Sequence, residues 1–188
     1  MKNVPGIFAA IAALAMLVSA VAVDQARAQD IGIGHAAPDF ALPDLQGRTR
    51  TLAQFRGRTV VIHFAATWCP FCNAEAPHLE ALHRAYRDKG VQVLIIDVNE
   101  TKAVVKKTAR RFAFTFPVLL DADGSVARIY APPPDVLPDL ARDEVMIASN
   151  LVIDRAGRIR FFSVLDTRRF DAKLAALRAV LDQVLTAP

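Results

Sequence analysis

Residues 59–72, TVVIHFAATWCPFC, place both cysteines of the 188-residue chain directly after a strand pattern. The segment 59–66 is a short apolar run rich in β-branched side chains, which predicts a buried strand. Cys69 and Cys72 follow it closely and are separated by only two residues. In open α/β sheets, ligand chemistry gathers at the carboxyl ends of strands. This stretch therefore predicts both the fold class and the functional site.

A long helix is predicted to follow the strand, over residues 70–90. Pro70 suits the first position of a helix, and Gly90 suits the position just past its end. Pro77, inside the segment, is expected to kink the helix. Cys69 then lies at the junction between a core strand and the start of a helix.

The rest of the chain alternates strand and helix patterns. The predicted elements are a strand at 91–98, a helix at 101–112, a strand at 116–121, a β-hairpin at 150–165 and a last amphipathic helix with Phe170, Leu174, Leu177, Leu181 and Val184 on one face. Strands joined by helices pair in parallel, whereas a hairpin adds antiparallel strands. We therefore expect an α/β fold with a central mixed sheet and helices on both faces.

Residues 1–28 have the layout of a secretory signal peptide. A positively charged start is followed by an apolar run over 7–23, and Ala26-Arg27-Ala28 offers small residues for cleavage. A retained anchor helix is the alternative, although the run falls just short of the roughly 20 residues that a span needs. Residues 29–188 suit one domain. We expect an exported, periplasmic or otherwise extracytoplasmic protein, tethered to the membrane if the segment stays uncleaved.

The overall charge does not point to a function. The chain has a net charge of +4, with Lys and Arg scattered among Asp and Glu. No basic run is long enough to indicate a nucleic-acid surface, so no nucleic-acid partner is expected. The pattern is that of an ordinary solvated surface.

An exported location limits the roles that Cys69 and Cys72 can have. An oxidising compartment allows disulfides, but a bridge across two residues closes too short a loop to stabilise the fold much. Structural zinc sites use four N or S ligands, usually from two such pairs, and this chain has one pair. A copper carrier that uses both thiolates and a histidine stays open as an alternative. The pair is predicted to be a redox couple, which needs no cofactor.

A strand followed by Trp-Cys-x-x-Cys and a helix is the signature of the thioredoxin fold. The stretch 37–72, APDFALPDLQGRTRTLAQFRGRTVVIHFAATWCPFC, resembles the exported TlpA/ResA-type thiol–disulfide oxidoreductases, which are related to the cytochrome c maturation reductants. NAEAPHLEAL at 73–82 and NLVIDRAGRI at 150–159 continue the likeness, which spans about residues 34–185. The resemblance implies a thioredoxin-like fold and a reductant of protein disulfides that receives electrons from a membrane carrier.

The chemistry of disulfide exchange assigns different roles to the two cysteines. A thiolate attacks a disulfide, and a second thiol resolves the resulting mixed disulfide. Cys69 is expected to be the exposed attacking thiol with a lowered pKa, because backbone N–H groups and the dipole at a helix start favour an anion. Cys72 is expected to be the more buried, resolving thiol. Trp68 is expected to shield the pair, and Pro70 and Phe71 separate its members.

Two further residues are candidates for tuning the thiols. Glu75 lies three residues after Cys72 and shares its helix face. In ResA-like proteins a glutamate at this place lies near the thiols, so the resemblance implies that Glu75 tunes their ionisation; a plain exposed glutamate is the alternative. His63 lies six residues before Cys69, where thioredoxin carries a buried acid that accepts a proton. A histidine suits that role because its pKa lies near neutrality, and a core histidine without a role is the alternative.

The chain departs from the family at Ala148, where thioredoxin-like proteins usually carry a cis-proline opposite the cysteines. The Ile147–Ala148 bond is expected to be trans, because a cis bond before a non-proline residue costs about 2.5–4 kcal/mol. Its backbone N–H would then be available near Cys69 to stabilise a thiolate. The preceding loop, 131–145, is long and Pro-rich. It is either a surface insertion or a loop that recognises protein partners.

A peroxiredoxin-like peroxidase is the rival enzyme, since that family shares the fold and the Ala-Pro-Asp-Phe lead-in. Peroxidases of this kind need Pro-x-x-x-Thr-x-x-Cys. Ala66 stands at the Thr position for Cys69, and Cys69 itself stands there for Cys72. The pattern therefore favours an exchange of disulfides, whereas its direction is not decided by the residues between the cysteines.

Overall fold

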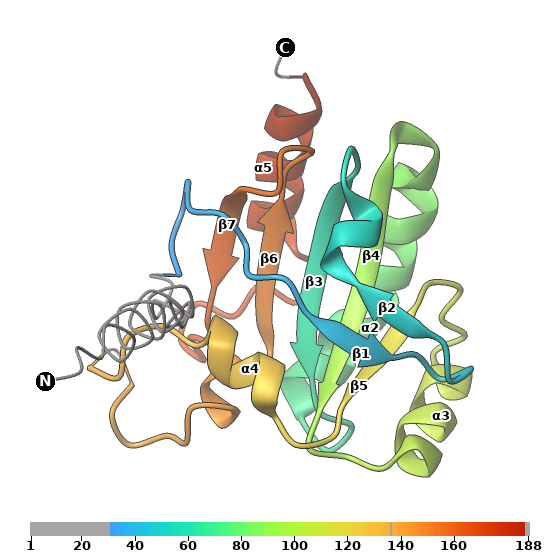
Figure 1. Ribbon diagram of the computed structural model, residues 1–188, viewed down its shortest axis with the longest axis vertical. Helices are drawn as coiled ribbons and strands as arrows, with labels where there is room; N and C mark the ends of the chain where they lie inside the picture. The colour runs from blue at the N-terminus through green and yellow to red at the C-terminus, as the bar shows by residue number, and fades with distance from the viewer. Residues whose placement is uncertain (1–30, 136, 187–188) are drawn as a thin grey trace, which may run out of the picture.

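Five strands form the central sheet of the computed structural model, which describes residues 31–135 and 137–186. They are β3 (Thr59–Ala65), β4 (Val91–Val98), β5 (Val118–Asp121), β6 (Ser149–Ile153) and β7 (Ile159–Ser163). Their order across the sheet is β5-β4-β3-β6-β7 (Figure 1). β4 runs parallel to both β3 and β5, whereas β6 is antiparallel to β3 and β7 is antiparallel to β6. The expected mixed sheet is confirmed.

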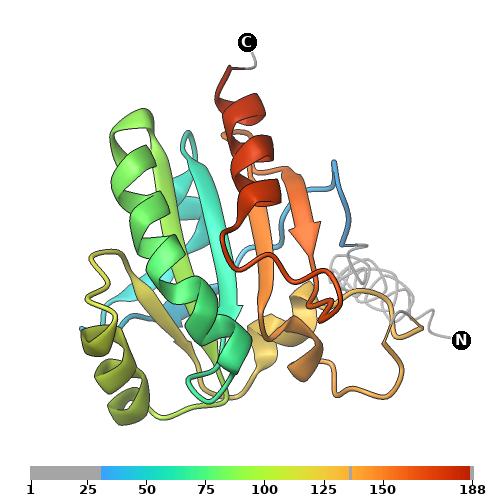
Figure 2. The ribbon, with the colours of Figure 1, turned by 180° about the vertical axis from the view of Figure 1, so that it is seen from behind.

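Helices cover both faces of the sheet. The helices are α2 (Pro70–Tyr86), α3 (Lys102–Arg111), α4 (Ser125–Tyr130) and α5 (Ala175–Thr186), with short 3-10 turns at η1 (Leu52–Phe55), η2 (Arg87–Lys89) and η3 (Glu144–Met146). α2, α3 and α5 lie on one face (Figure 2). α4 lies on the other face with the hairpin of β1 (Ala41–Pro43) and β2 (Thr49–Thr51) (Figure 1). The crossovers through α2 and α3 explain why β3, β4 and β5 are parallel.

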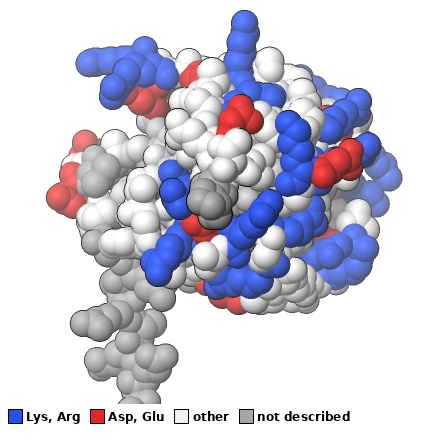
Figure 3. Space-filling model, turned by 90° about the horizontal axis from the view of Figure 1, so that it is seen from above, with Lys and Arg blue, Asp and Glu red and all other residues white. Residues whose placement is uncertain are grey.

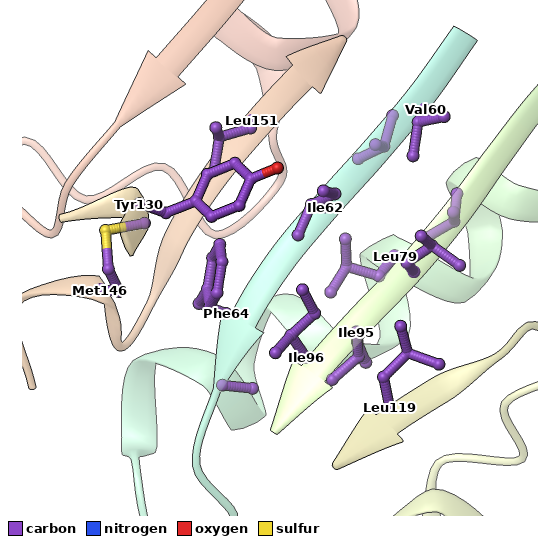
Figure 4. Close-up of a cluster of buried hydrophobic side chains, with 14 of the residues drawn as sticks. Val60, Ile62, Phe64, Leu79, Ile95, Ile96, Leu119, Tyr130, Met146 and Leu151 are labelled. Atoms are coloured by element: carbon purple, nitrogen blue, oxygen red, sulfur yellow. The ribbon is translucent and has the colours of Figure 1, made fainter. Parts of the chain in front are cut away.

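The central strands are buried along their whole length, as expected for strands covered on both faces. On the α4 side, Phe64 packs against Tyr130 with ring centroids 5.5 Å apart, and Met146 and Leu151 lie beside them (Figure 4). On the other side, α2 contributes Leu79 to the core. The sheet is thus a rigid platform whose carboxyl edge carries the cysteine pair.

Most predicted elements are confirmed, and the differences have local causes. The helix over α2 continues through Pro77 and ends at Tyr86, with η2 completing the path to Gly90 in the left-handed conformation. The last helix begins only at Ala175, so Phe170 and Leu174, both predicted on its face, precede it. α4 and the β1–β2 hairpin were not predicted, because each is too short to show a periodic pattern.

The expected signal peptide, 1–28, lies outside the described residues. In the described part, no helix is both long and apolar enough to cross a membrane. Figure 3 views the molecule from the end opposite the start of α2, where Lys and Arg side chains are spread with Asp and Glu between them.

Candidate active site

Cys69 is the N-cap residue of α2, directly after the carboxyl end of β3. Its backbone is extended, with φ −75° and ψ 117°, and Pro70 occupies the first helical position. The backbone N–H of Cys72 donates a hydrogen bond to Cys69 Sγ, with 3.2 Å between N and S. Both cysteines are free thiols. A sulfur atom here takes the place of the side-chain oxygen that usually caps a helix. The backbone N–H groups of the first turn, which have no acceptor within the helix, are therefore available to stabilise Cys69 Sγ.

The two thiols differ strongly in acidity. A hydrogen bond from the Cys72 thiol, reinforced by the N–H groups of Cys72 and Phe71, lowers the pKa of Cys69 to about 6, against the opposing effect of burial. The same hydrogen bond and burial raise the pKa of Cys72 far above its usual range. Near neutral pH, one thiolate is therefore formed and the neighbouring thiol keeps its proton. The lowering has the expected direction, but its largest cause is the hydrogen bond from the Cys72 thiol and not the start of the helix.

The surroundings of the pair differ from expectation in two respects. Cys69 is 3% exposed and Cys72 is 5% exposed, so the first thiol is not the open one that was predicted. Trp68 is 66% exposed, and most of its surface faces solvent instead of shielding the pair. Phe71 packs edge to face against Phe170, with ring centroids 4.9 Å apart. The residues just before α5, and not Trp68, therefore cover this side of the site.

Glu75 belongs to a buried polar cluster with Asn150 and His63. Glu75 is 3% exposed, which excludes the exposed-glutamate alternative. Asn150 Nδ2 donates to Glu75 Oε1 over 3.1 Å, and Asn150 Oδ1 lies 3.0 Å from His63 Nδ1. His63 Nδ1 is also 3.4 Å from Glu75 Oε2. Because Asn150 uses its oxygen toward the imidazole, His63 carries its proton on Nδ1, and Nε2 is the acceptor.

The two titratable members of this cluster are both neutral near pH 7. Burial raises the pKa of Glu75 to about 8, which the hydrogen bond from Asn150 only partly offsets. Burial also lowers the pKa of His63 to about 4. Despite their proximity, the side chains of Glu75 and His63 are both neutral and form no ion pair, and each is hydrogen-bonded to Asn150. The cluster is within electrostatic reach of the thiols, since the Cys69 charge contributes to the raised pKa of Glu75.

Asn150 was missed by sequence reasoning, although it links the other two residues. It faces His63 directly across the β3–β6 pair. The available signal was an amide at the beginning of a predicted buried strand, where an apolar residue would be usual. Its partner could not be known without the register of the two strands.

The backbone of Ala148 matches the expectation for its peptide bond but not for its N–H group. The described residues contain no cis peptide bond, which confirms the trans bond, but Ala148 has a φ of 65°. Its N–H donates to the Phe64 carbonyl over 2.9 Å. The prediction of an N–H available to the Cys69 thiolate is therefore wrong, because the sheet already uses that donor. The residue is also buried.

A groove of about 320 Å³ opens beside Glu75, Ala148 and Asn150. Its other walls come from β7, the segment after it and α5, with apolar residues that include Phe161, Val164, Leu165, Phe170, Leu174 and Leu177. Val164 and Leu165 also line a second hollow that reaches Leu137 and Leu140 of the Pro-rich loop. The Arg142 guanidinium bonds the Ala131 and Pro132 carbonyls and closes this loop at its base. The loop thus borders the far end of the groove.

Metal ligation finds no support in the geometry. Within residues 31–135 and 137–186, no group of three or more His, Cys, Asp or Glu side chains is placed to hold a metal ion. His63 turns Nδ1 toward Asn150 and Glu75.

Comparison with known proteins places this geometry in a family. Residues 33–162 match the AhpC/TSA family. The chain belongs to this family. It is 34% identical over 130 residues to the thiol–disulfide oxidoreductase ResA of Geobacillus thermodenitrificans, covering 69% of this chain and 68% of the relative. It is 30% identical over 133 residues to ResA of Bacillus thuringiensis, covering 71% of this chain and 70% of the relative. Within this family, the chain is thus a thiol–disulfide oxidoreductase similar to ResA.

Solved structures agree on the fold. A thiol:disulfide interchange protein of the thioredoxin family from Chlorobium tepidum superposes with a TM-score of 0.63, covering 82% of this chain and 98% of that chain. Its sequence identity is 23%, so the likeness concerns the fold. The thioredoxin-like architecture expected from the Trp-Cys-x-x-Cys context is confirmed.

Proposed function

We propose that the protein is an extracytoplasmic reductant of protein disulfides in which Cys69 attacks and Cys72 resolves. The observation that carries the proposal is the hydrogen bond from the Cys72 N–H to Cys69 Sγ at the start of α2. It selects one sulfur as the anion and holds the second thiol beside it. The signal-peptide pattern supports an extracytoplasmic location, and the family resemblance supports a membrane electron donor.

The reaction proceeds in two exchanges. The Cys69 thiolate attacks one sulfur of the client disulfide, the client S–S bond breaks, and one client thiolate leaves. Cys72 then loses its proton and attacks Cys69 Sγ, which releases the second client thiolate. The client gains two electrons and two protons, and the protein is left with a Cys69–Cys72 disulfide. A membrane electron carrier would restore the dithiol.

Cys69 has the charge for attack but little exposure, so the client has to open the site. The groove beside Ala148 is the surface that supports this step, because apolar side chains form much of its wall and Ala148 bonds Phe64 near the carboxyl end of β3. We infer that an extended client segment lies there, with the 131–145 loop as its outer contact. A Pro-rich loop is stiff and loses little entropy on binding.

The polar cluster supports a tuning role for Glu75 and His63. Glu75, with a pKa of about 8, changes charge near the working pH, and its charge raises the pKa of Cys72. Replacing it by Gln keeps its size and its bond to Asn150. The thiolate titration curve of the reduced protein is then expected to move by a measurable fraction of a unit. An unchanged curve would leave Glu75 a structural residue.

Trapping of clients tests the proposed roles. In Cys72→Ser the resolving thiol is absent, so mixed disulfides between Cys69 and clients should accumulate, whereas Cys69→Ser should trap none. Limiting alkylation followed by peptide mapping should label Cys69 first. Preferential labelling of Cys72 would contradict the assignment. Peroxide consumption with a thiol donor, and metal content after purification without chelator, test the peroxidase and copper alternatives.

A further inference from the structure

A second, smaller cavity lies on the other side of Cys72 from the groove. Its volume is about 30 Å³, and it lies between the sheet, the first turns of α2, and α3. Apolar residues of α3 form much of its wall, among them Val105 and Phe112. The polar side chains that line it are those of His63, Thr67, Cys72, Asn73, Asp97 and Thr108. The Cys72 thiol and the Asp97 carboxyl group therefore line the same cavity, and the mechanism proposed above does not use Asp97.

Asp97 lies in β4 and pairs in register with Ala65 of β3. It is 3% exposed, and its Oδ1 has no hydrogen-bond partner among the described residues. His63 Nε2 is buried and equally without a partner in that part of the chain. A buried polar atom without a partner costs about 1–3 kcal/mol, so two such atoms at one cavity call for an explanation.

A water molecule bound in the cavity would give both atoms a hydrogen-bond partner. One water needs roughly 10–15 Å³ of accessible space and two to four polar partners. The cavity offers this space, and the Cys72 thiol, His63 Nε2 and Asp97 Oδ1 are three suitable partners. We propose that Asp97 exchanges a proton with the Cys72 thiol through water held in this cavity. The inference rests on the proposed dithiol function and adds to it the destination of the resolving proton.

The charges around the cavity favour Asp97 as the acceptor. The titratable groups that face Asp97 are Cys72 from α2, His63 from β3 and Glu100 from the loop after β4. The residues of α3 and β5 that line the cavity carry no charge. Burial, the charge of Glu100 and a side-chain hydrogen bond with Glu100 raise the pKa of Asp97 to about 8, so Asp97 becomes a carboxylate only above that pH. His63, whose pKa is about 4, is a much weaker base, so it orients the water rather than taking the proton.

The proposed step balances within the exchange already described. In the mixed disulfide, above about pH 8 where Asp97 is ionised, the Cys72 proton passes through the water to the Asp97 carboxylate while Cys72 Sγ attacks Cys69 Sγ. The bond between Cys69 and the client sulfur breaks, and the client thiolate leaves with the electron pair. Asp97 afterwards loses the proton to solvent. When the disulfide is reduced again, the same path returns a proton to Cys72.

The test uses the aromatic disulfide 5,5′-dithiobis(2-nitrobenzoate), which releases one coloured thiolate when Cys69 attacks and another when Cys72 resolves. In Asp97→Asn, stopped-flow measurements at pH 9, where wild-type Asp97 is ionised, should show the first release within twofold of wild type and the second slowed about tenfold or more. The matched control is Asp121→Asn, a buried carboxyl at the end of β5 that does not line the cavity. Both of its phases should remain as in wild type.

The outcomes separate the two proposals. A wild-type protein that releases only one thiolate would overturn the dithiol function and this inference with it. If wild type shows both phases and Asp97→Asn shows them unchanged, or slows both equally, Asp97 has no role in resolution. An NMR titration of the wild-type protein provides a second test of the proposal. The ¹³C-carboxyl resonance of Asp97 should titrate with different midpoints in the reduced and oxidised proteins, and identical midpoints would contradict the proposal.

Discussion

His63 Nδ1 and Glu75 Oε2 lie 3.4 Å apart, yet the two side chains form a neutral pair. Burial disfavours the charged form of each, and its effect exceeds their mutual attraction. The amide of Asn150 hydrogen-bonds Glu75 Oε1 and His63 Nδ1 without requiring a charge on either group. A proton is therefore stored beside the thiols in the resting protein.

The stored proton makes stability depend on pH. The folded protein keeps Glu75 protonated up to about pH 8, whereas the unfolded chain ionises it near 4.5. The folded state binds more protons in this window, so the free energy of unfolding should fall as pH rises from about 5 to 8. In Glu75→Gln this fall should be smaller by at least about 1 kcal/mol, since one pKa unit corresponds to about 1.4 kcal/mol. Urea unfolding at several pH values measures it.

Glu80→Gln is the matched control for this experiment. Glu80 is also buried on α2, but its pKa is lowered, with hydrogen bonds from Thr115 and Arg84 overcoming the effect of burial. Its contribution is present above the unfolded pKa and is lost only as pH falls below it. The slope between pH 5 and 8 should therefore match that of wild type. Equal slopes in wild type and Glu75→Gln would refute the neutral-pair description.

The acidity of Cys69 should depend on the hydrogen-bond donor at position 72. The Cys72 thiol is the main cause of the lowered pKa of Cys69, ahead of the backbone N–H groups. In Cys72→Ala the pKa of Cys69 should rise toward its usual value. Cys72→Ser retains an O–H donor, so the rise should be smaller. Absorbance of the thiolate at 240 nm against pH measures both; a lower pKa in Cys72→Ala than in Cys72→Ser would contradict this account.

Ala148 offers a test of backbone strain. Its φ of 65° lies in the left-handed region, which costs a non-glycine residue about 1–2 kcal/mol. Ala148→Gly should therefore raise the free energy of unfolding, partly offset by the greater flexibility of glycine in the unfolded chain. Ala148→Pro should lower it by about 3 kcal/mol or more, because proline requires φ near −65° and removes the N–H that bonds Phe64. Denaturant unfolding that ranks Pro above Gly would contradict the described backbone.

The fold was largely predictable because its signals are local. The apolar run of β3, Pro70 at the start of α2 and the cysteine spacing lie within one continuous stretch, and each has a direct physical meaning. The cysteine pair and the lowered pKa of Cys69 followed from the same stretch. Asn150 and Asp97 could not be placed, because strand register brings them to the site from distant parts of the chain.

The exposure of side chains was harder to predict than their position. Trp68 was expected to shield the cysteines, but Phe71 and Phe170 pack together beside them instead. Phe170 belonged to the pattern of the last helix, and only the late start of α5 frees it for this contact. The backbone conformation of Ala148 could not be predicted either, because the neighbouring residues in the sequence do not require a positive φ.

A redox titration of Cys69 and Cys72 against glutathione tests the central claim most directly. The protein is equilibrated at a series of ratios of reduced to oxidised glutathione, quenched with an alkylating agent and weighed by mass spectrometry. The account requires a single two-electron transition between the dithiol and the internal disulfide, and its loss in Cys69→Ser and Cys72→Ser. Thiols that stay reduced at every ratio, or that form only glutathione adducts, would show that the pair is not a redox couple.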